Sequence, residues 1–263
     1  MRKELHHTMH DTTQCWYKNH CERYGSDTCN WSCKHMQETK YMLDLSELPL
    51  KYRVHQDIDM SRLNEQARSY VYEMTRDLSF YVKHGFSAYF YGDVGTGKTS
   101  WAVYALTNYF SQISEHSYHQ CRGLYIAVPK LLRDIRLNMT YKDDNFYELI
   151  CEIPKVDFVV WDDVYQTGPT DFEKQWLFSL IDERIANGKS SIFTSNHSPE
   201  SLGRIDERLY SRICANSDCV AFIGDDLRGR YKFTDFLKEE QSYINSQSDD
   251  DVISSSNEDI TTT

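Results

Sequence analysis

The chain contains 263 residues, of which 40% are hydrophobic, and this is enough for one α/β domain of ordinary size with small appendages. Its net charge is -11, but seven acids and no Lys or Arg follow residue 238, so the rest of the chain carries -4 in total. This acidic balance argues against avid non-specific binding to duplex DNA. No stretch approaches the roughly 20 apolar residues of a membrane span, and the first residues lack an apolar signal core, so we expect a cytoplasmic protein with no membrane partner.

Four cysteines are crowded between residues 13 and 36, with two histidines among them. A segment this short cannot bury enough apolar surface to fold by itself, whereas thiolate ligands on Zn²⁺ supply folding free energy directly. We therefore predict a small Cys-rich zinc-binding module over residues 1–41; the alternative is that the thiols are reduced and unligated. The predicted ligands are Cys15, Cys21, Cys29 and Cys33, and either His20 or His35 could replace one of them.

A connector over residues 42–60 is expected to follow, because Pro49 interrupts regular structure. The main domain then begins with a helix predicted over residues 61–84, for which Ser61 is a good N-cap. Apolar residues recur along this helix at steps of three and four, which is the spacing of a buried helix face. A glycine then stops the helix before an apolar strand at residues 88–91.

The strongest signal in the sequence follows this strand, where every fixed position of the phosphate-loop pattern G-x-x-x-x-G-K-S/T is filled. A helix predicted from Ser100 to Phe110 comes next, so strand, glycine loop and helix stand in the order that phosphate binding requires. Glycines let the N–H groups of the loop point at a phosphate, and the helix N-terminus adds about half a positive charge. We expect Lys98 to reach the β- and γ-phosphates of ATP and Thr99 to bind Mg²⁺. The predicted nucleotide-binding residues are Gly92, Asp93, Val94, Gly95, Thr96, Gly97, Lys98, Thr99 and Ser100.

The chain then alternates again, and the predicted elements are a strand, two helices and a strand, over residues 123–128, 129–137, 146–151 and 156–163. The last of these strands ends in two carboxylates, Asp162 and Asp163. Buried parallel strands deliver functional groups at the carboxyl edge of the sheet, where the phosphate loop also lies. We therefore predict that Asp162 binds Mg²⁺ and that Asp163 is the general base that polarises the attacking water; the alternative is a solvated acidic turn.

The next helix is predicted over residues 171–187, with Asp171 as its cap, and a strand follows at residues 190–196. The strand ends in Asn196, which can donate to a γ-phosphate and accept from a water molecule at once. We predict that Asn196 is a catalytic sensor of this kind. The predicted inner face of the helix consists of Phe172, Trp176, Leu177, Leu180, Ile181 and Ile185.

An amphipathic helix predicted over residues 202–214 carries Arg208 and Arg212, four residues apart. From their spacing alone these arginines are either functional or ordinary solvated charges. A fifth strand is predicted at residues 218–224. Residues 239–263 are polar and acidic, and this composition predicts a disordered tail.

The order of these parts resembles the AAA+ ATPases, and more closely the bacterial and phage helicase loaders of the DnaC, DnaI and IstB kind. The resemblance covers about residues 48–230, and it implies a P-loop domain over residues 61–238 with a parallel five-stranded sheet and flanking helices. It also implies that Arg212 is an arginine finger on the ATP of a neighbouring subunit, with Arg208 as the runner-up. The resemblance rests on the phosphate loop, Trp161-Asp162-Asp163, Phe193-Thr194-Ser195-Asn196 and the segment from Glu207 to Ile213.

The resemblance further implies an ATP-dependent loader or remodeller of the replicative DNA helicase, which acts in the initiation of DNA replication. Such a protein forms a homo-oligomer on binding ATP, and single-stranded DNA is a further expected partner. Asp163 departs from the family pattern, which often has Glu at this position, so we expect slow hydrolysis. The alternatives are an IstB-like helper of a transposase, a nucleotide-gated adaptor with little turnover, and a small-molecule kinase built on the same loop.

Overall fold

The structure is a computed structural model that describes residues 15–16, 18, 21–26, 29, 33–53, 58–114, 120–138, 143–165 and 169–226. The chain divides into two compact units, Met1–Asp226 and Leu227–Thr263, and every described residue belongs to the first. The acidic tail predicted over residues 239–263 lies outside the described residues, as does His20. None of the helices in the described ranges is long and apolar enough to cross a membrane.

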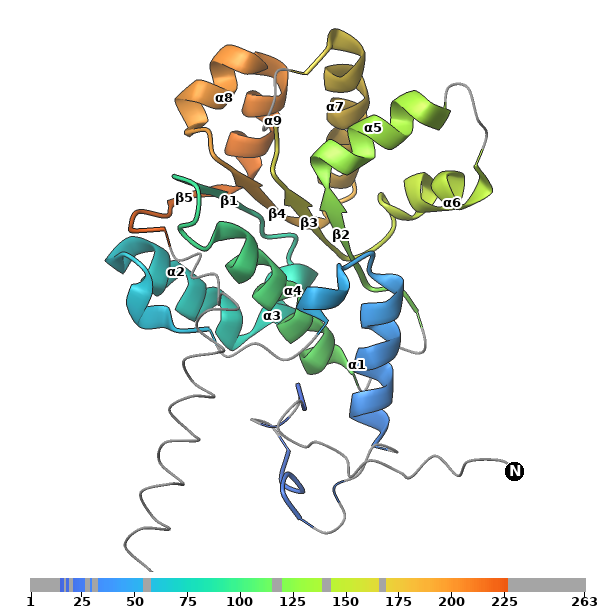
Figure 1. Ribbon diagram of the computed structural model, residues 1–263, viewed down its shortest axis with the longest axis vertical. Coiled ribbons are helices and arrows are strands. Elements are labelled where there is room, and N and C mark those ends of the chain that lie inside the picture. The colour runs from blue at the N-terminus through green and yellow to red at the C-terminus, as the bar shows by residue number, and fades with distance from the viewer. Residues whose placement is uncertain are drawn as a thin grey trace, which may run out of the picture. The chain divides into compact units, whose positions relative to one another are not determined.

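The described residues contain a parallel sheet of five strands, which confirms the predicted α/β fold with a five-stranded parallel sheet (Figure 1). The strands are β1 (Ala88–Tyr91), β2 (Gly123–Ala127), β3 (Phe158–Asp162), β4 (Ser190–Ser195) and β5 (Asp218–Ala221). They lie in the order β2-β3-β4-β1-β5, and each neighbouring pair is parallel. β4 therefore lies between β1, the strand before the phosphate loop, and β3, which ends at Asp162 and is followed by Asp163. The carboxyl ends of both strands lie at one edge of the sheet.

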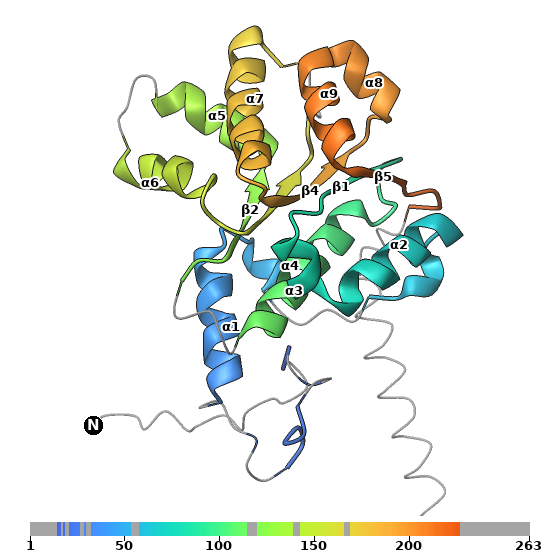
Figure 2. The ribbon, with the colours of Figure 1, turned by 180° about the vertical axis from the view of Figure 1, so that it is seen from behind.

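Helices cover both faces of the sheet, and a separate hydrophobic core fills each side (Figures 1 and 2). Alternate residues of β3 serve the two cores: Phe158 and Val160 belong to one, and Val159 and Trp161 to the other. The first face is covered by α1 (Lys34–Leu45), α2 (Glu65–Arg76), α3 (Leu78–Lys83) and α4 (Lys98–Ile113). The second is covered by α5 (Val128–Asn138), α6 (Asp144–Glu152), α7 (Asp171–Ala186), α8 (Pro199–Ile205) and α9 (Glu207–Asn216).

The helix predicted over residues 61–84 is interrupted twice, and its predicted N-cap is wrong. A short 3₁₀ turn, Met60–Arg62, precedes α2, for which Asn64 rather than Ser61 is the N-cap residue. The second break falls at Asp77, whose backbone leaves the helical region and whose side chain accepts a hydrogen bond from the N–H of Phe80. Asp77 thus caps α3, and an aspartate that caps a new helix competes with continuation of the old one.

The helix predicted over residues 202–214 also consists of two helices, α8 and α9. Asp206 separates them: its φ is -152°, its carboxylate accepts from the N–H of Leu209, and it accepts again from the hydroxyl of Tyr165. Earlier in the chain, α7 is capped by Thr170 in a capping box with Glu173, and not by Asp171. Phe172 and Trp176 of α7 are more than one-third exposed and so lie outside the inner face predicted for them, whereas Leu177, Leu180 and Ile181 are buried.

The described part of the N-terminal segment is joined to the main core. Helix α1 runs across the boundary expected at residue 41, and its Met42 and Leu43 are fully buried in the core that lies against α4. After α1, the carbonyl of Ser46 accepts a hydrogen bond of 2.7 Å from the N–H of Tyr125 on the edge strand β2. The expected connector therefore contributes to the main fold, and a second 3₁₀ turn, Leu50–Tyr52, lies within it.

Candidate nucleotide-binding site

The phosphate loop runs from the end of β1 to the start of α4, and its glycines adopt backbone angles that other residues rarely reach. Gly92, Gly95 and Gly97 have φ values of 144°, 87° and 94°, and Gly97 is the N-cap residue of α4. A methyl group added at Gly92 would overlap the carbonyl oxygen of Phe222, and one added at Gly95 would overlap the carboxylate of Asp226. At Gly92 backbone angle and space therefore both require glycine, whereas at Gly95 the backbone angle requires it, because the Asp226 side chain can move aside.

Lys98 is folded into the loop that precedes it. Its ammonium donates hydrogen bonds to the carbonyl oxygens of Gly92, at 2.8 Å, and Asp93, at 2.7 Å, and the side chain is almost completely buried. The hydroxyl of Thr96 donates to the same Asp93 carbonyl at 2.8 Å. The loop thus closes around a positive charge at the N-terminus of a 16-residue helix, which is the arrangement that binds a phosphate group.

Asp162, at the end of β3, lies directly beside this loop. Within the described ranges, three hydroxyl groups donate hydrogen bonds to its carboxylate: Thr99 and Thr194 to Oδ1, each at 2.7 Å, and Tyr125 to Oδ2, at 2.6 Å. The side chain of Asp162 is 6% exposed. The two residues predicted to bind Mg²⁺, Thr99 and Asp162, are therefore in contact, and their oxygens are of the kind that Mg²⁺ prefers.

Thr194 and Tyr125 are site residues that sequence reasoning missed. Thr194 lies within the segment Phe193-Thr194-Ser195-Asn196, and its hydroxyl also accepts from the N–H of Asp163 at 3.0 Å. Tyr125 has no sequence signal, because the order of strands in the sheet decides that β2 lies next to β3. Burial, followed by the negative charge of Asp162, raises the pKa of Tyr125 above its usual range, so its hydroxyl is a proton donor at neutral pH.

The remaining predicted catalytic residues near the sheet edge are partly exposed. Asp163 has a left-handed backbone, with φ of 58°, immediately after β3. Asn196 follows Ser195 at the end of β4. Both lie at the carboxyl edge with the phosphate loop, as predicted, but their catalytic roles stay predictions.

Arg212 contacts helix α7 of its own chain. Its Nε donates to Asp182 Oδ1 at 2.8 Å, and half of the side chain is exposed. The guanidinium of Arg208 lies 4.3 Å from the ring centre of Phe178, also on α7. Both arginines thus lie on α9 and contact α7, so the described contacts do not bring either of them to the phosphate loop of the same chain.

The predicted zinc ligands do not form a cluster in the described part of the chain, where no group of three or more His, Cys, Asp or Glu side chains is placed to hold a metal ion. Cys15 is buried, and Cys21, Cys29 and Cys33 are partly exposed free thiols. The ring of His35 contacts the hydroxyl of Ser114 through Nδ1 at 2.9 Å. The zinc site stays a prediction.

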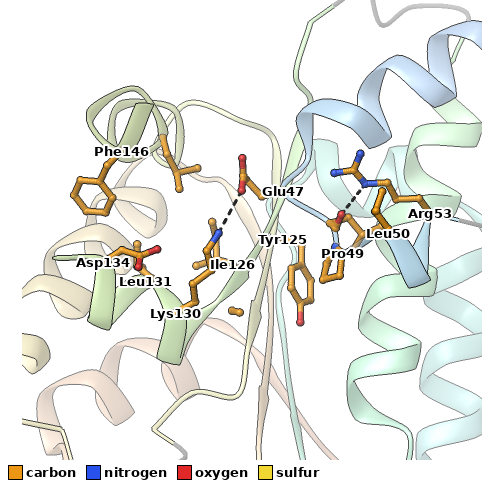
Figure 3. Close-up of a pocket in the computed structure, with 13 residues that line it drawn as sticks. Glu47, Pro49, Leu50, Arg53, Tyr125, Ile126, Lys130, Leu131, Asp134 and Phe146 are labelled. Atoms are coloured by element: carbon orange, nitrogen blue, oxygen red, sulfur yellow. Dashed lines mark hydrogen bonds and ion pairs between the residues drawn. The ribbon is translucent and has the colours of Figure 1, made fainter. Parts of the chain in front are cut away.

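A largely apolar pocket of about 330 Å³ lies at the edge of the sheet, and Tyr125, whose hydroxyl contacts Asp162, is one of its lining residues (Figure 3). The segment after α1 forms one wall, α5 and α6 form the other, and Tyr125 of β2 lies between them. Glu47 and Lys130 form an ion pair of 3.7 Å across it. The apolar lining residues are Leu48, Pro49, Leu50, Ile126, Ala127, Leu131, Phe146 and Leu149.

A glycine loop between β1 and α4, beside a threonine and an aspartate in contact on a sheet of this order, defines a P-loop nucleotide-binding protein of the AAA+ class. Comparison with known families agrees. The model of the bacterial DnaA ATPase domain matches residues 63–217, more than half of the chain, and the chain belongs to this family.

Individual relatives are more distant. The chromosomal replication initiator protein DnaA of Mesoplasma florum is 29% identical over 126 residues, which are 47% of this chain and 27% of that protein. DnaA of Leptothrix cholodnii is 30% identical over 127 residues, which are 48% of this chain and 24% of that protein. The chain thus spans about a quarter of the length of these two relatives.

Solved structures share the fold at low sequence identity. A crystal structure of the DnaC helicase loader is 18% identical with a TM-score of 0.51, and the match covers 66% of this chain and all of that one. A structure of DnaI is 20% identical with a TM-score of 0.50 and coverages of 65% and 88%. The replication initiator DnaA bound to AMPPCP and single-stranded DNA is 21% identical with a TM-score of 0.50 and coverages of 78% and 56%.

Proposed function

We propose that this protein is a Mg²⁺-dependent ATPase that loads or remodels a replicative DNA helicase when DNA replication is initiated. The observation that carries the ATPase part is the contact between Thr99 of the phosphate loop and Asp162 of β3, because it joins the two oxygen ligands that a magnesium nucleotide needs. The helicase part is supported by coverage: the fold matches the whole of the DnaC chain but about half of the DnaA chain.

ATP binding begins with the loop. Its backbone N–H groups and the N-terminus of α4 take up the phosphates, and Lys98 turns from the carbonyls of Gly92 and Asp93 to the β- and γ-phosphates. Thr99 and Asp162 would hold Mg²⁺, which neutralises charge on the phosphates when it is bound. Thr194 and Tyr125 keep the Asp162 carboxylate in place.

Hydrolysis then depends on groups around the γ-phosphate. Asp163 takes the proton of the attacking water, and Asn196 holds that water and the γ-phosphate in line. Arg212 leaves Asp182 and stabilises the charge of the transition state on the ATP of a neighbouring copy, so hydrolysis requires a homo-oligomer. ATP binding thus assembles the protein, and hydrolysis releases it from the helicase and single-stranded DNA.

Two substitutions separate nucleotide binding from chemistry. Lys98→Ala should weaken ATP binding about a hundredfold, because a buried charge that contacts the phosphates is lost. Asp163→Asn should bind ATP like the wild type and hydrolyse it roughly 10² to 10⁴ times more slowly, because the base is lost and the metal ligand is kept. Fluorescent-nucleotide titration and phosphate release measure the two steps. Unchanged ATP affinity in Lys98→Ala would refute the site, and wild-type protein that binds ATP without turnover would identify a nucleotide-gated adaptor instead.

A second experiment tests whether Arg212 acts on a neighbouring copy. Arg212→Ala should bind ATP normally and lose about 10³-fold in turnover, whereas Arg208→Ala, on the same helix, should lose much less. Mixing Arg212→Ala with Lys98→Ala should restore part of the activity, because an intact loop then meets an intact arginine in mixed assemblies. If mixtures that are shown to co-assemble recover no activity, Arg212 does not act in trans. A greater loss in Arg208→Ala would transfer the role to that residue.

The N-terminal cysteines are proposed to bind zinc, and this proposal is supported by the presence of four cysteines within 19 residues. Purified protein should contain about one zinc ion per chain with sulfur-dominated ligation, measured by elemental analysis and X-ray absorption. Replacing Cys29 and Cys33 together by Ser should release the ion and leave ATP affinity unchanged. Cys151→Ser, at an exposed cysteine of α6, is the matched control and should retain zinc. Protein purified without chelator that holds no zinc would show that these thiols are unligated.

A further inference from the structure

The two oxygens of the Asp162 carboxylate have different surroundings. Oδ1 accepts from Thr99 of the phosphate-loop helix and from Thr194 of β4, whereas Oδ2 accepts from Tyr125 of β2. The distance from Tyr125 Oη to Oδ2 is 2.6 Å, which is typical of a strong hydrogen bond between a hydroxyl and an ionised carboxylate. Oδ1 is therefore the oxygen on the side of Thr99, the other proposed Mg²⁺ ligand. Oδ2 is held by the hydroxyl of Tyr125 on β2.

Tyr125 is rigidly held in this position. Its backbone pairs with Val160 of β3, and because residues two apart on a strand share a face, its side chain lies on the same face as that of Asp162. The backbone N–H is bonded to Ser46, and the ring lies 6.4 Å from the ring of Tyr52. The side chain is 7% exposed. The hydroxyl is thus fixed by the sheet edge and by the segment after α1, independently of the phosphate loop.

We propose that Tyr125 is a positioning residue that makes the nucleotide site selective for Mg²⁺ over Ca²⁺, an inference that rests on the proposed ATPase function. Mg²⁺ requires a near-ideal octahedron of short bonds, whereas Ca²⁺ takes six to eight oxygens and readily accepts both oxygens of one carboxylate. The hydrogen bond from Tyr125 holds Oδ2 toward β2 and so opposes the rotation that would turn both oxygens of Asp162 to one cation. Oδ1 lies on the side of Thr99 and accepts from Thr99 and Thr194; it becomes available to the smaller ion when Thr99 turns its hydroxyl oxygen to the metal and releases its hydrogen bond.

The test uses Tyr125→Phe, which keeps the ring, the contact with Tyr52 and the pocket wall, and removes the hydroxyl. Affinity for a fluorescent, non-hydrolysable ATP analogue is measured in Mg²⁺, in Ca²⁺ and in EDTA. In Tyr125→Phe the preference for Mg²⁺ over Ca²⁺ should fall about tenfold, which is the smaller effect expected when an outer contact of a metal ligand is lost, while affinity in EDTA stays unchanged. Tyr52→Phe is the matched control, because it removes a neighbouring tyrosine hydroxyl that does not contact Asp162; its affinities should equal those of the wild type. Urea unfolding midpoints check that both variants are folded.

Several results would overturn the inference. Tyr125→Phe that binds the analogue with wild-type affinity in all three conditions would show that the hydroxyl does not act on the metal site. A loss by the same factor in Mg²⁺, Ca²⁺ and EDTA would show that it supports the fold alone. Wild-type protein without preference for Mg²⁺ would remove the selectivity but leave the nucleotide site intact. Wild-type protein that binds no analogue in any condition would overturn the proposed function and this inference together.

Discussion

A buried carboxylate at the end of β3 constrains the arrangement of the elements around it. An ionised carboxylate removed from water is costly unless hydrogen bonds satisfy its oxygens, and Asp162 is almost completely buried. Its described donors come from three separate elements: α4 through Thr99, β2 through Tyr125 and β4 through Thr194. The strand order places β3 between β2 and β4, so the two neighbouring strands can supply two of the donors. The phosphate loop is thereby fastened to the sheet.

A buried arginine fixes the opposite end of the same strands. Arg184 of α7 is 1% exposed, and its guanidinium donates to the carbonyl oxygens of Ile153 and Val156, just before β3, at 2.6 and 2.8 Å. It also donates to the carbonyl of Ser190, where β4 begins, at 2.5 Å. A guanidinium group has several donors in a fixed planar arrangement, so it can bind several carbonyl oxygens at once. The starts of β3 and β4 are thus held at one edge while Asp162 and Thr194 meet at the other.

The sequence predicts those parts of the site that lie within one short stretch of the chain and follow a local pattern of residues. The glycine loop, the apolar strands and the paired aspartates follow from spacing alone, and the positions of the five strands agree with the structure. The helix breaks at Asp77 and Asp206 were missed because the apolar period continues across both, and the side-chain caps that cause the breaks depend on local geometry. Composition predicts a boundary at residue 41, whereas α1 runs across that position and its Met42 and Leu43 are buried in the main core.

Tyr125 shows what sequence alone does not contain. Its hydroxyl reaches Asp162 because β2 is the neighbour of β3, and strand order is a property of the whole sheet. Thr194 does have a sequence signal, because it stands two residues before Asn196 in the same strand-end segment, and its hydroxyl makes the contact with Asp162. The role proposed for Arg212 requires a second copy of the chain, so a single sequence cannot establish it.

A crystal structure of the protein with Mn²⁺ and a non-hydrolysable ATP analogue would test the central role of Asp162 most directly, because anomalous scattering locates Mn²⁺ unambiguously. The account predicts the triphosphate in the loop from Gly92 to Thr99 and the ion bound by Thr99 Oγ1 and Asp162 Oδ1, with the Tyr125 hydroxyl still on Oδ2. An ion bound by both oxygens of Asp162, an ion bound by neither, or an analogue bound outside the loop would contradict it.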